Sequence, residues 1–467
     1  MHLSTDPSKD GNDLVSSAQP QEAATHTLSI SQPDDPPIKY RSSEQETLVE
    51  GEASAPGVIA DTSTNMGTQA GFRSFGQKTR LAVKTAWRQW YRAFKEVLPI
   101  YIAVHLAFFT ISCLAVLFIL PDFSPQAERL YTLWQSWHHW DTGNYLVVAL
   151  HGYLTVHQTA FFPLYPLFER ALMVITQDPF TAGLIVSNLA GLVMLAVLYR
   201  LVEEDFDQPR AYRTVLYLSL FPTAFFFAAA YNESLFLCLS LLSFYYMRHG
   251  RWWLAGPFGF LACLTRSAGL LLLIPFCYEY FRQHHFNLKA VRFDVVAGLL
   301  IPAGIALFAL YCYVQFHDAL AFSHAEVYWG RTLHVPGYGI LKSMRDILYS
   351  SGFLSFLSLR NLLDLGPDLL ILALIVLSFF GPWKLPRSLW AYGLYAAGLY
   401  IFAQIFPRGF TLYPLEAVSR FMLEVFPAFI VLASIGKYRT LHLSYLMVSG
   451  AILFFLLTQF LTGHWVL

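Results

Sequence analysis

The chain has 467 residues, of which 55% are hydrophobic, 16% aromatic and only 13% charged, and its mean hydropathy is +0.45. Soluble proteins carry roughly 25% charged residues, so this shortage excludes an ordinary soluble enzyme and predicts an all-α protein that crosses a membrane several times. The net charge is zero, so nothing in the composition indicates a nucleic acid partner.

The N-terminal region differs from the rest of the chain. Residues 1–70 are rich in Ser, Thr, Pro, Asp, Glu and Gln and poor in aromatics, so we expect a disordered cytoplasmic tail. In residues 71–96, basic and aromatic side chains are interleaved, which predicts an amphipathic juxtamembrane helix on the cytoplasmic membrane face. A binding site for calmodulin or another protein is the alternative interpretation of that segment.

Residues 97–467 form the predicted transmembrane domain, with about eleven spans (nine to thirteen). Several are shorter than the roughly 20 residues that a straight span needs, and 252–281 could instead be a broken or re-entrant pair. The predicted spans are 97–120, 180–202, 214–231, 233–247, 252–265, 268–281, 294–316, 366–382, 388–405, 420–436 and 444–461.

The distribution of Lys and Arg orients these spans. Nineteen of these residues fall in or next to the proposed cytoplasmic loops and nine on the opposite side, in longer loops. The positive-inside rule therefore places a first large loop, 121–179, and a later loop, 317–365, outside the cytoplasm. The five cysteines lie in apolar segments without metal-ligand spacing, so we expect small core residues and no disulfide framework; they are Cys113, Cys238, Cys263, Cys277 and Cys312.

Asp141 is the most informative residue of the first external loop. Trp137, Asp141 and Tyr145 recur at four-residue spacing, which on a helix puts a carboxylate between two aromatic rings. Such an arrangement suits a general base above a flat polar substrate such as a sugar. The alternative is that Asp141 caps a helix or pairs with a neighbouring histidine.

Further polar residues lie at predicted external membrane boundaries. Glu233 could accept a hydrogen bond from a sugar, hold an arginine, or lie in a solvated turn. Arg266 suits a lipid phosphate, because a guanidinium binds phosphate through two hydrogen bonds, although reaching toward lipid head groups is the alternative. Arg331 and Arg420 are two more candidates for phosphate contact.

Aromatic and polar residues also gather in the later loop and at the C-terminus. His324, Glu326, Trp329 and Arg331 form a polar-aromatic patch, and the chain closes with Gly463-His464-Trp465, an interfacial anchor or a part of the site. The sequence contains no Gly-rich nucleotide loop, P-loop or paired-Cys zinc site. An enzyme of this kind would take an activated donor from the membrane, and we expect no cofactor and no metal.

The motifs resemble those of the PIG-V family, the second mannosyltransferases of GPI-anchor assembly, and their prokaryotic relatives, within the GT-C class of polytopic glycosyltransferases. The resemblance covers roughly residues 97–467. One departure is Arg420-Phe421, where members of the family usually have Arg followed by Tyr. The motifs are Trp140-Asp141, Tyr145, His151-Gly152-Tyr153, Phe161 to Pro166, Phe221-Pro222, Tyr231 to Ser234, Thr265 to Gly269, Trp329 to Arg331, Ser419 to Phe421, Phe426-Pro427 and Gly463 to Trp465.

The resemblance implies a GT-C fold and an inverting transfer of mannose from a polyprenyl-phosphate donor to a lipid-linked or glycan acceptor, on the non-cytoplasmic face. It assigns Asp141 as the base and Arg266, Arg331 and Arg420 to the donor phosphate. The residues expected to bind substrate are Trp140, Tyr145, His151, Tyr165, Asn232, Glu233, His324 and Trp329.

Two alternatives to this function stay open: a GT-C transferase of another sugar, and a flippase or transporter of lipid-linked sugars. The expected partners are the lipid-linked donor, the acceptor and membrane lipids, with room for a small membrane partner subunit. We expect a multi-pass protein of a bacterial plasma membrane, or of the endoplasmic reticulum membrane if the chain is eukaryotic.

Overall fold

The computed structural model describes residues 66–120, 124–350, 352 and 354–464, with side chains from Trp87 onward. Nearly all of the predicted tail, and Trp465 of the C-terminal motif, lie outside these residues. The described part of the chain contains α-helices and 3₁₀ helices and no β-strand, which confirms the predicted all-α fold class.

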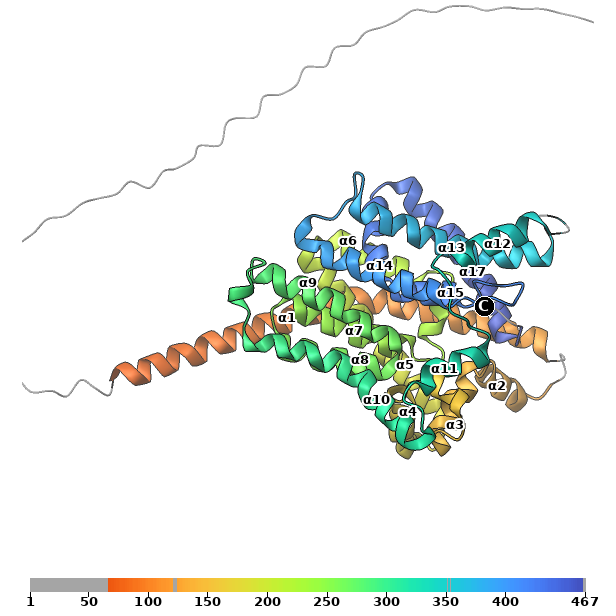
Figure 1. Cartoon of the computed structure of the whole chain (residues 1–467), viewed down its shortest axis with the longest axis horizontal. Coiled ribbons are helices and arrows are strands. Elements are labelled where there is room, and N and C mark those ends of the chain that lie inside the picture. The colour runs from red at the N-terminus through yellow and green to blue at the C-terminus, as the bar shows by residue number, and fades with distance from the viewer. Residues whose placement is uncertain (1–65, 121–123, 351, 353, 465–467) are drawn as a thin grey trace, which may run out of the picture. The chain divides into compact units, whose positions relative to one another are not determined.

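The α-helices are arranged as labelled in Figure 1. They are α1 (Met66–Ile119), α2 (Gln126–Gln135), α3 (Asp141–His151), α4 (Leu164–Thr176), α5 (Pro179–Asp205), α6 (Gln208–Ser219), α7 (Glu233–Arg248), α8 (Trp252–Thr265), α9 (Leu273–Gln283), α10 (Leu300–Phe316), α11 (Ala321–His324), α12 (Tyr338–Leu348), α13 (Phe356–Phe379), α14 (Trp390–Ile405), α15 (Val418–Phe421), α16 (Phe426–Ile435) and α17 (Arg439–Leu461).

Eight short 3₁₀ helices connect or extend these elements. They are η1 (Val156–Ala160), η2 (Ala224–Phe227), η3 (Ser267–Leu272), η4 (Leu288–Ala290), η5 (Phe293–Leu299), η6 (Ala325–Trp329), η7 (Arg387–Leu389) and η8 (Met422–Glu424).

Five helical segments of the described part are long and apolar enough to cross a membrane: Trp87–Ile119, Pro179–Asp205, Phe293–Phe316, Phe356–Phe379 and Arg439–Leu461. A sixth would be the pair Val418–Glu424 and Phe426–Ile435, which bends by 79°. The chain is therefore a multi-pass membrane protein, as its composition predicts. The count of eleven spans stays a prediction.

Local signals explain where the long helices begin. Asp178 caps α5 by accepting a hydrogen bond from the Thr181 amide at 2.8 Å, and Pro179 follows at the first helical position. At α13 the Ser355 hydroxyl accepts from the Ser358 amide at 3.2 Å. Both caps precede long apolar runs, so the polar start and the apolar interior together define these spans.

One predicted element differs from the observed ones. The juxtamembrane segment and the first predicted span are parts of one continuous helix, α1, from Met66 to Ile119. The expected span at 214–231 is not a single helix: α6 ends at Ser219, and the following residues are irregular or in η2. Pro222 cannot continue a helix there. Residues 221–231 are buried inside the protein.

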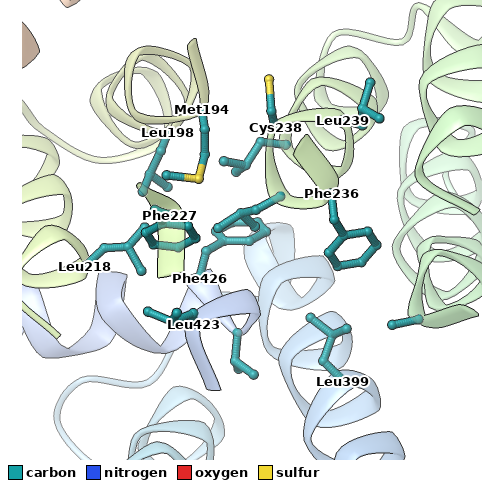
Figure 2. Close-up of a cluster of buried hydrophobic side chains, with 14 of the residues drawn as sticks. Met194, Leu198, Leu218, Phe227, Phe236, Cys238, Leu239, Leu399, Leu423 and Phe426 are labelled. Carbon is teal, nitrogen blue, oxygen red and sulfur yellow. The ribbon is translucent and has the colours of Figure 1, made fainter. Parts of the chain in front are cut away.

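The core lies where η2 and α7 meet helices from both halves of the chain. Figure 2 shows Met194 and Leu198 of α5 and Phe236 of α7 close to Phe426 of α16 and Leu399 of α14. Helix α7 packs against α5 and α8, and α8 packs against α10, so these four helices follow one another in space; Figure 1 shows α7, α8 and α10 side by side. This packing fixes the ends of α7 and α8, which carry the polar residues of the site.

The cysteines agree only in part with the expectation of core residues. All five are unpaired, and Cys238, Cys263 and Cys312 are buried. Cys113 on α1 and Cys277 on α9 are exposed.

Candidate active site

A cavity of about 270 Å³ collects polar residues from distant parts of the chain. Its wall comes from the start of α3, the segment before α4, the irregular stretch before α7, the α8–η3 junction, η6, and the loop leading into α15. The lining residues are Trp140, Asp141, Asn144, Tyr145, Ala160, Phe161, Phe162, Phe226, Tyr231, Asn232, Thr265, Arg266, Ser267, Glu326, Trp329, Arg331, Arg408, Glu416, Ala417, Arg420 and Phe421.

Asp141 is the first residue of α3 and faces this cavity. The preceding Trp140 has φ 46° and ψ −111°, a backbone conformation that a bulky side chain rarely adopts, and such strain concentrates at functional sites. The positive end of the α3 dipole favours a carboxylate at this position. Asp141 and Tyr145 lie one turn apart on the same helix, and both line the cavity.

The expectation that Trp137 shares this helix face was wrong. Helix α2 ends at Gln135 and α3 starts at Asp141, so Trp137 lies in the connection. Its indole N–H donates to the Ser112 hydroxyl of α1 at 3.0 Å, and its ring packs on Phe460. Trp137 therefore anchors the loop to α1 and α17, away from the cavity lining.

Arg420 connects the two carboxylates that the sequence singled out. Its Nη1 donates to Asp141 Oδ2 at 2.6 Å, and its Nε donates to Glu233 Oε1. Glu233 is fully buried behind the cavity wall, so it lies in no solvated turn. The guanidinium also lies over the Tyr231 ring, 4.6 Å from its centre. Arg420 is thereby held in one orientation, with Asp141 as its partner on the cavity side.

Arg266 also forms an ion pair with Glu233. Its Nη1 donates to Glu233 Oε1 at 2.9 Å and to Asn232 Oδ1 at 3.1 Å, and it lies 3.1 Å from Glu424 Oε1. The side chain is 16% exposed. These internal partners, rather than lipid head groups, hold Arg266 at the cavity wall.

Phe421 lies against two of the candidate phosphate ligands. The guanidinium carbon of Arg266 is 4.9 Å from the Phe421 ring centre and that of Arg331 is 5.0 Å from it. A ring attracts cations at its face without neutralising their charge. Phe421 therefore holds two cations close together at the cavity, without the hydroxyl that the family usually has there.

A second group of charges completes the wall, and two of its members, Arg408 and Glu416, were not assigned from the sequence. Arg408 pairs with Glu416 through its Nη1 and donates from Nε to the Trp329 carbonyl at 2.9 Å. Arg331 donates to the Phe406 carbonyl at 2.9 Å and lies 3.7 Å from Glu326. Burial raises the pKa of Glu326 and lowers the pKa of Arg331. The 406–420 loop is thus part of the site.

Aromatic rings make up much of the remaining surface. Tyr145 packs edge-on against Phe161 at 5.1 Å, and Phe161 packs in the same way against Trp329 at 5.4 Å. Trp140 contacts Phe460 at the end of α17, with 5.1 Å between ring centres. Burial is the main cause that raises the pKa of Tyr145 well above its usual value. The cavity lining therefore combines aromatic rings with charged side chains.

The structure brings most of the residues predicted from the sequence together. Asp141, Trp140, Tyr145, Asn232, Trp329, Arg266, Arg331 and Arg420 line the cavity. Four predicted residues do not line it. Glu233 lies behind the wall, and Tyr165 is buried with its hydroxyl 2.8 Å from that of Ser187. His151 is exposed at the end of α3, and His324 pairs with Asp318 at 2.7 Å.

The residues that sequence reasoning missed are Arg408, Glu416, Asn144 and Ser267. Asn144 and Ser267 each lie within three residues of a predicted one, so proximity was an available signal. Arg408 and Glu416 had no such signal beyond their place in a predicted external loop. Within the described part of the chain, no group of three or more His, Cys, Asp or Glu side chains could hold a metal ion.

These observations define a polytopic all-α membrane protein with a cavity that is both cationic and aromatic and contains a carboxylate. Residues 158–311 match the family model described as dolichyl-phosphate-mannose-protein mannosyltransferase. The chain is 34% identical over 143 residues to GPI mannosyltransferase 2 of Yarrowia lipolytica, covering 30% of this chain and 39% of that one. It is 35% identical over 147 residues to GPI alpha-1,6-mannosyltransferase 2 of Rattus norvegicus, covering 28% and 29%.

The matched segments confirm the resemblance to the PIG-V family that the motifs indicate, over less than two fifths of these relatives' length. Among solved structures, the chain is similar to ArnT from Cupriavidus metallidurans bound to undecaprenyl phosphate. The TM-score is 0.44 at 15% identity, covering 72% of this chain and 59% of that one. It is also similar to the oligosaccharyltransferase of Archaeoglobus fulgidus, with a TM-score of 0.40 at 12% identity, covering 78% and 56%.

Proposed function

We propose that this protein is a mannosyltransferase that moves mannose from a polyprenyl-phosphate donor to a hydroxyl of a lipid-linked or glycan acceptor. The observation that carries the proposal is the convergence of Asp141, Arg266, Arg331 and Arg420 on one cavity with aromatic walls. The matched relatives are named mannosyltransferases, which favours mannose as the sugar.

Asp141 is the proposed general base. Its carboxylate would accept the proton of the acceptor hydroxyl as that oxygen attacks the anomeric carbon. The bond from this carbon to the phosphate oxygen breaks on the opposite face, so the configuration of the sugar inverts. Asp141 is 25% exposed, which leaves it accessible from the cavity while Arg420 orients it.

The arginines are the proposed binding site of the departing phosphate. Guanidinium groups can each give two hydrogen bonds to a phosphate and stabilise the charge that develops on it. Arg420 donates to Asp141 at 2.6 Å, so a phosphate that binds Arg420 would compete with this ion pair. Donor binding would then release the carboxylate from Arg420 and leave it free to accept the proton of the acceptor hydroxyl.

The aromatic walls are the proposed contacts for the sugar. Trp140, Tyr145 and Trp329 line the cavity, and ring faces suit the apolar faces of a hexose. Asn232 offers an amide beside the arginines, although its oxygen already accepts from Arg266. This arrangement fits a hexose as a class and does not select mannose over another one.

The test uses the full chain reconstituted in liposomes with labelled polyprenyl-phosphate mannose and a total lipid extract. Wild type is compared with Asp141→Asn and with Glu128→Gln, a carboxylate-to-amide change at an exposed position of α2 in the same loop. We expect label in a new lipid or glycan with wild type and Glu128→Gln, and none with Asp141→Asn. Competition by other polyprenyl-phosphate sugars measures the preference for mannose.

Three outcomes would contradict parts of this proposal. Transfer that survives in Asp141→Asn would remove Asp141 as the base and direct attention to Glu233. Equal transfer of a different sugar would overturn mannose as the preferred donor. Donor binding without transfer of any lipid-phosphate sugar would instead favour a transporter.

A further inference from the structure

A second cavity, of about 460 Å³, lies between α1, α6 and the start of α17. It is separate from the candidate active site and shares no residue with it. Its lining residues are Glu96, Gln208, Pro209, Tyr212, Arg213, Gly436, Lys437, Arg439 and His442. The wall thus holds three permanent cations, one histidine and a single carboxylate.

The three cations of this pocket lack acidic partners. Among the described residues, no Asp or Glu oxygen lies within 4.0 Å of a side-chain nitrogen of Arg213, Lys437 or Arg439. Arg213 Nε donates to the Ala433 carbonyl at 2.8 Å, and Lys437 Nζ lies 5.0 Å from the Tyr438 ring centre. Neither contact neutralises the charge. In the active-site cavity, by contrast, every arginine is paired with an acid.

The fold places this pocket about one bilayer away from the candidate active site. Helix α17 starts at Arg439 in the pocket, and its far end contacts Trp140 through Phe460. Its 23 residues correspond to roughly 35 Å, close to the thickness of a membrane core. By the positive-inside rule this end of α17 is predicted to face the cytoplasm, where anionic lipids are enriched.

We infer that this pocket binds the phosphate-bearing headgroup of an anionic membrane lipid. Arg213, Lys437 and Arg439 provide three unneutralised donors around one cavity, and the Tyr212 side chain is half exposed beside them. His442 is held by a 2.7 Å hydrogen bond between its Nδ1 and the Tyr217 hydroxyl, so its other nitrogen is oriented by α6. Glu96 can accept a hydrogen bond from a headgroup hydroxyl. Basic pockets of this kind between transmembrane helices bind phosphate-bearing lipid headgroups.

The experiment measures lipid binding to the full chain purified in a neutral detergent. Dioleoyl phosphatidylglycerol is titrated and the bound lipid is counted by native mass spectrometry, with dioleoyl phosphatidylcholine as the zwitterionic reference. We expect one phosphatidylglycerol to be retained by wild type. The triple variant Arg213→Gln, Lys437→Gln and Arg439→Gln should bind it on the order of a hundredfold more weakly, if each cation contributes as it does at a lipid surface.

A matched triple variant controls for the loss of charge. Lys289, Arg292 and Lys384 are exposed, lie in other loops predicted to face the cytoplasm, and form no ion pair with an acid of the described residues. Changed together to Gln, they should leave the affinity within about twofold. Equal losses in both triples would overturn the proposal, because the effect would then be one of general surface charge. The proposal also fails if phosphatidylcholine binds equally, or if inorganic phosphate binds the pocket while phosphatidylglycerol does not. The elution profile and Tm of both triples establish that they are folded.

Discussion

Two clusters of buried charges lie at opposite ends of α7, and they differ in what surrounds them. At the start of the helix, Glu233 pairs with Arg266 and Arg420 beside the candidate active-site cavity. At its end, Arg248 pairs with Asp205 of α5 at 2.7 Å and with Glu279 of α9 at 2.6 Å. The 16 residues of α7 separate the two by roughly 24 Å. We call them the site cluster and the inner cluster.

The two clusters differ in whether their cations can be reached from a cavity. In the inner cluster, Arg248 binds two carboxylates and the Ser388 carbonyl, and Tyr392 donates to Asp205 at 2.5 Å. Neither Arg248 nor its partners line either cavity described above. In the site cluster, Arg266 and Arg420 face the cavity. Buried ion pairs therefore do not indicate a functional site by themselves, since the inner cluster has them too. The cavity next to the ion pairs of the site cluster is what distinguishes it.

Loss of Arg420 tests this comparison with the largest expected effect. Arg420→Gln removes the partner of Asp141 and one proposed phosphate ligand, so kcat/KM for mannosyl transfer should fall by about 10²–10³, as it does when one transition-state donor is removed. Initial rates in proteoliposomes with labelled donor measure this. Arg248→Gln is the matched control, and a similar loss of turnover in both variants would show that the cavity makes no difference.

Loss of Arg248 should affect folding instead of chemistry. Arg248→Gln removes the cation that pairs with Asp205 and leaves Glu279 with Arg282 alone, and breaking a buried pair in this way costs about 3–5 kcal/mol. We expect a clearly lower Tm in detergent, with the turnover of the folded fraction unchanged. Arg387→Gln, at an exposed position, serves as the control. An unchanged Tm for Arg248→Gln would mean that the inner cluster does not stabilise the fold.

The sequence anticipated the site cluster better than the inner cluster, for a physical reason. Asp141 interrupts an aromatic run in a predicted external loop, and Arg266 and Arg420 stand at predicted external membrane boundaries, where a charge is costly. Arg200, Arg248 and Arg282 stand next to short loops, and the positive-inside rule accounts for them without any partner. Arg200 and Arg282 pair with acids of their own helices, whereas the partners of Arg248, Asp205 and Glu279, lie on other helices, so only the packed structure reveals those pairs.

The sequence could not predict which charged residues far apart in the chain pair with each other. Asp141 and Arg420 are 279 positions apart, and no local periodicity joins them. The segment at 214–231 shows the same limit for the fold. Its hydrophobic run satisfies the composition of a span, yet α6 stops at Ser219 and the rest is buried irregular chain. Hydropathy reports that a segment is apolar, and a segment buried by protein has the same amino-acid composition as one buried by lipid.

Glu169 of α4 sharpens the comparison, because it is a buried acid without an arginine. Among the described residues, neither of its oxygens has a hydrogen-bond partner, and burial raises its pKa to about 9. Below pH 4.5 both the folded and unfolded states are protonated. Between pH 4.5 and 9 only the unfolded state ionises, so the stability of the fold falls over that window.

Glu169→Gln should therefore raise the Tm relative to wild type, with a difference that grows as the pH increases toward 9 and is smallest near pH 5. Melting curves of the detergent-solubilised protein at several pH values measure this difference. Glu128→Gln, at an exposed position on α2, should show no such trend. A constant difference across the pH range would mean that Glu169 is ionised in the folded protein and has a partner.

The smallest expected effect is at Phe421, whose ring lies against Arg266 of the site cluster and Arg331 of the cavity wall. Phe421→Leu keeps the bulk but removes the ring from Arg266 and Arg331, and each cation–π contact is worth about 0.5–2 kcal/mol. We expect a roughly tenfold rise in KM for the donor with little change in kcat, since 1.4 kcal/mol corresponds to tenfold. Phe421→Tyr retains both ring faces and should stay near the wild-type value. If Phe421→Leu lowers kcat and leaves KM unchanged, the ring acts on the reacting groups instead of on donor binding, and Arg331 would then belong to the chemistry as much as Arg420 does.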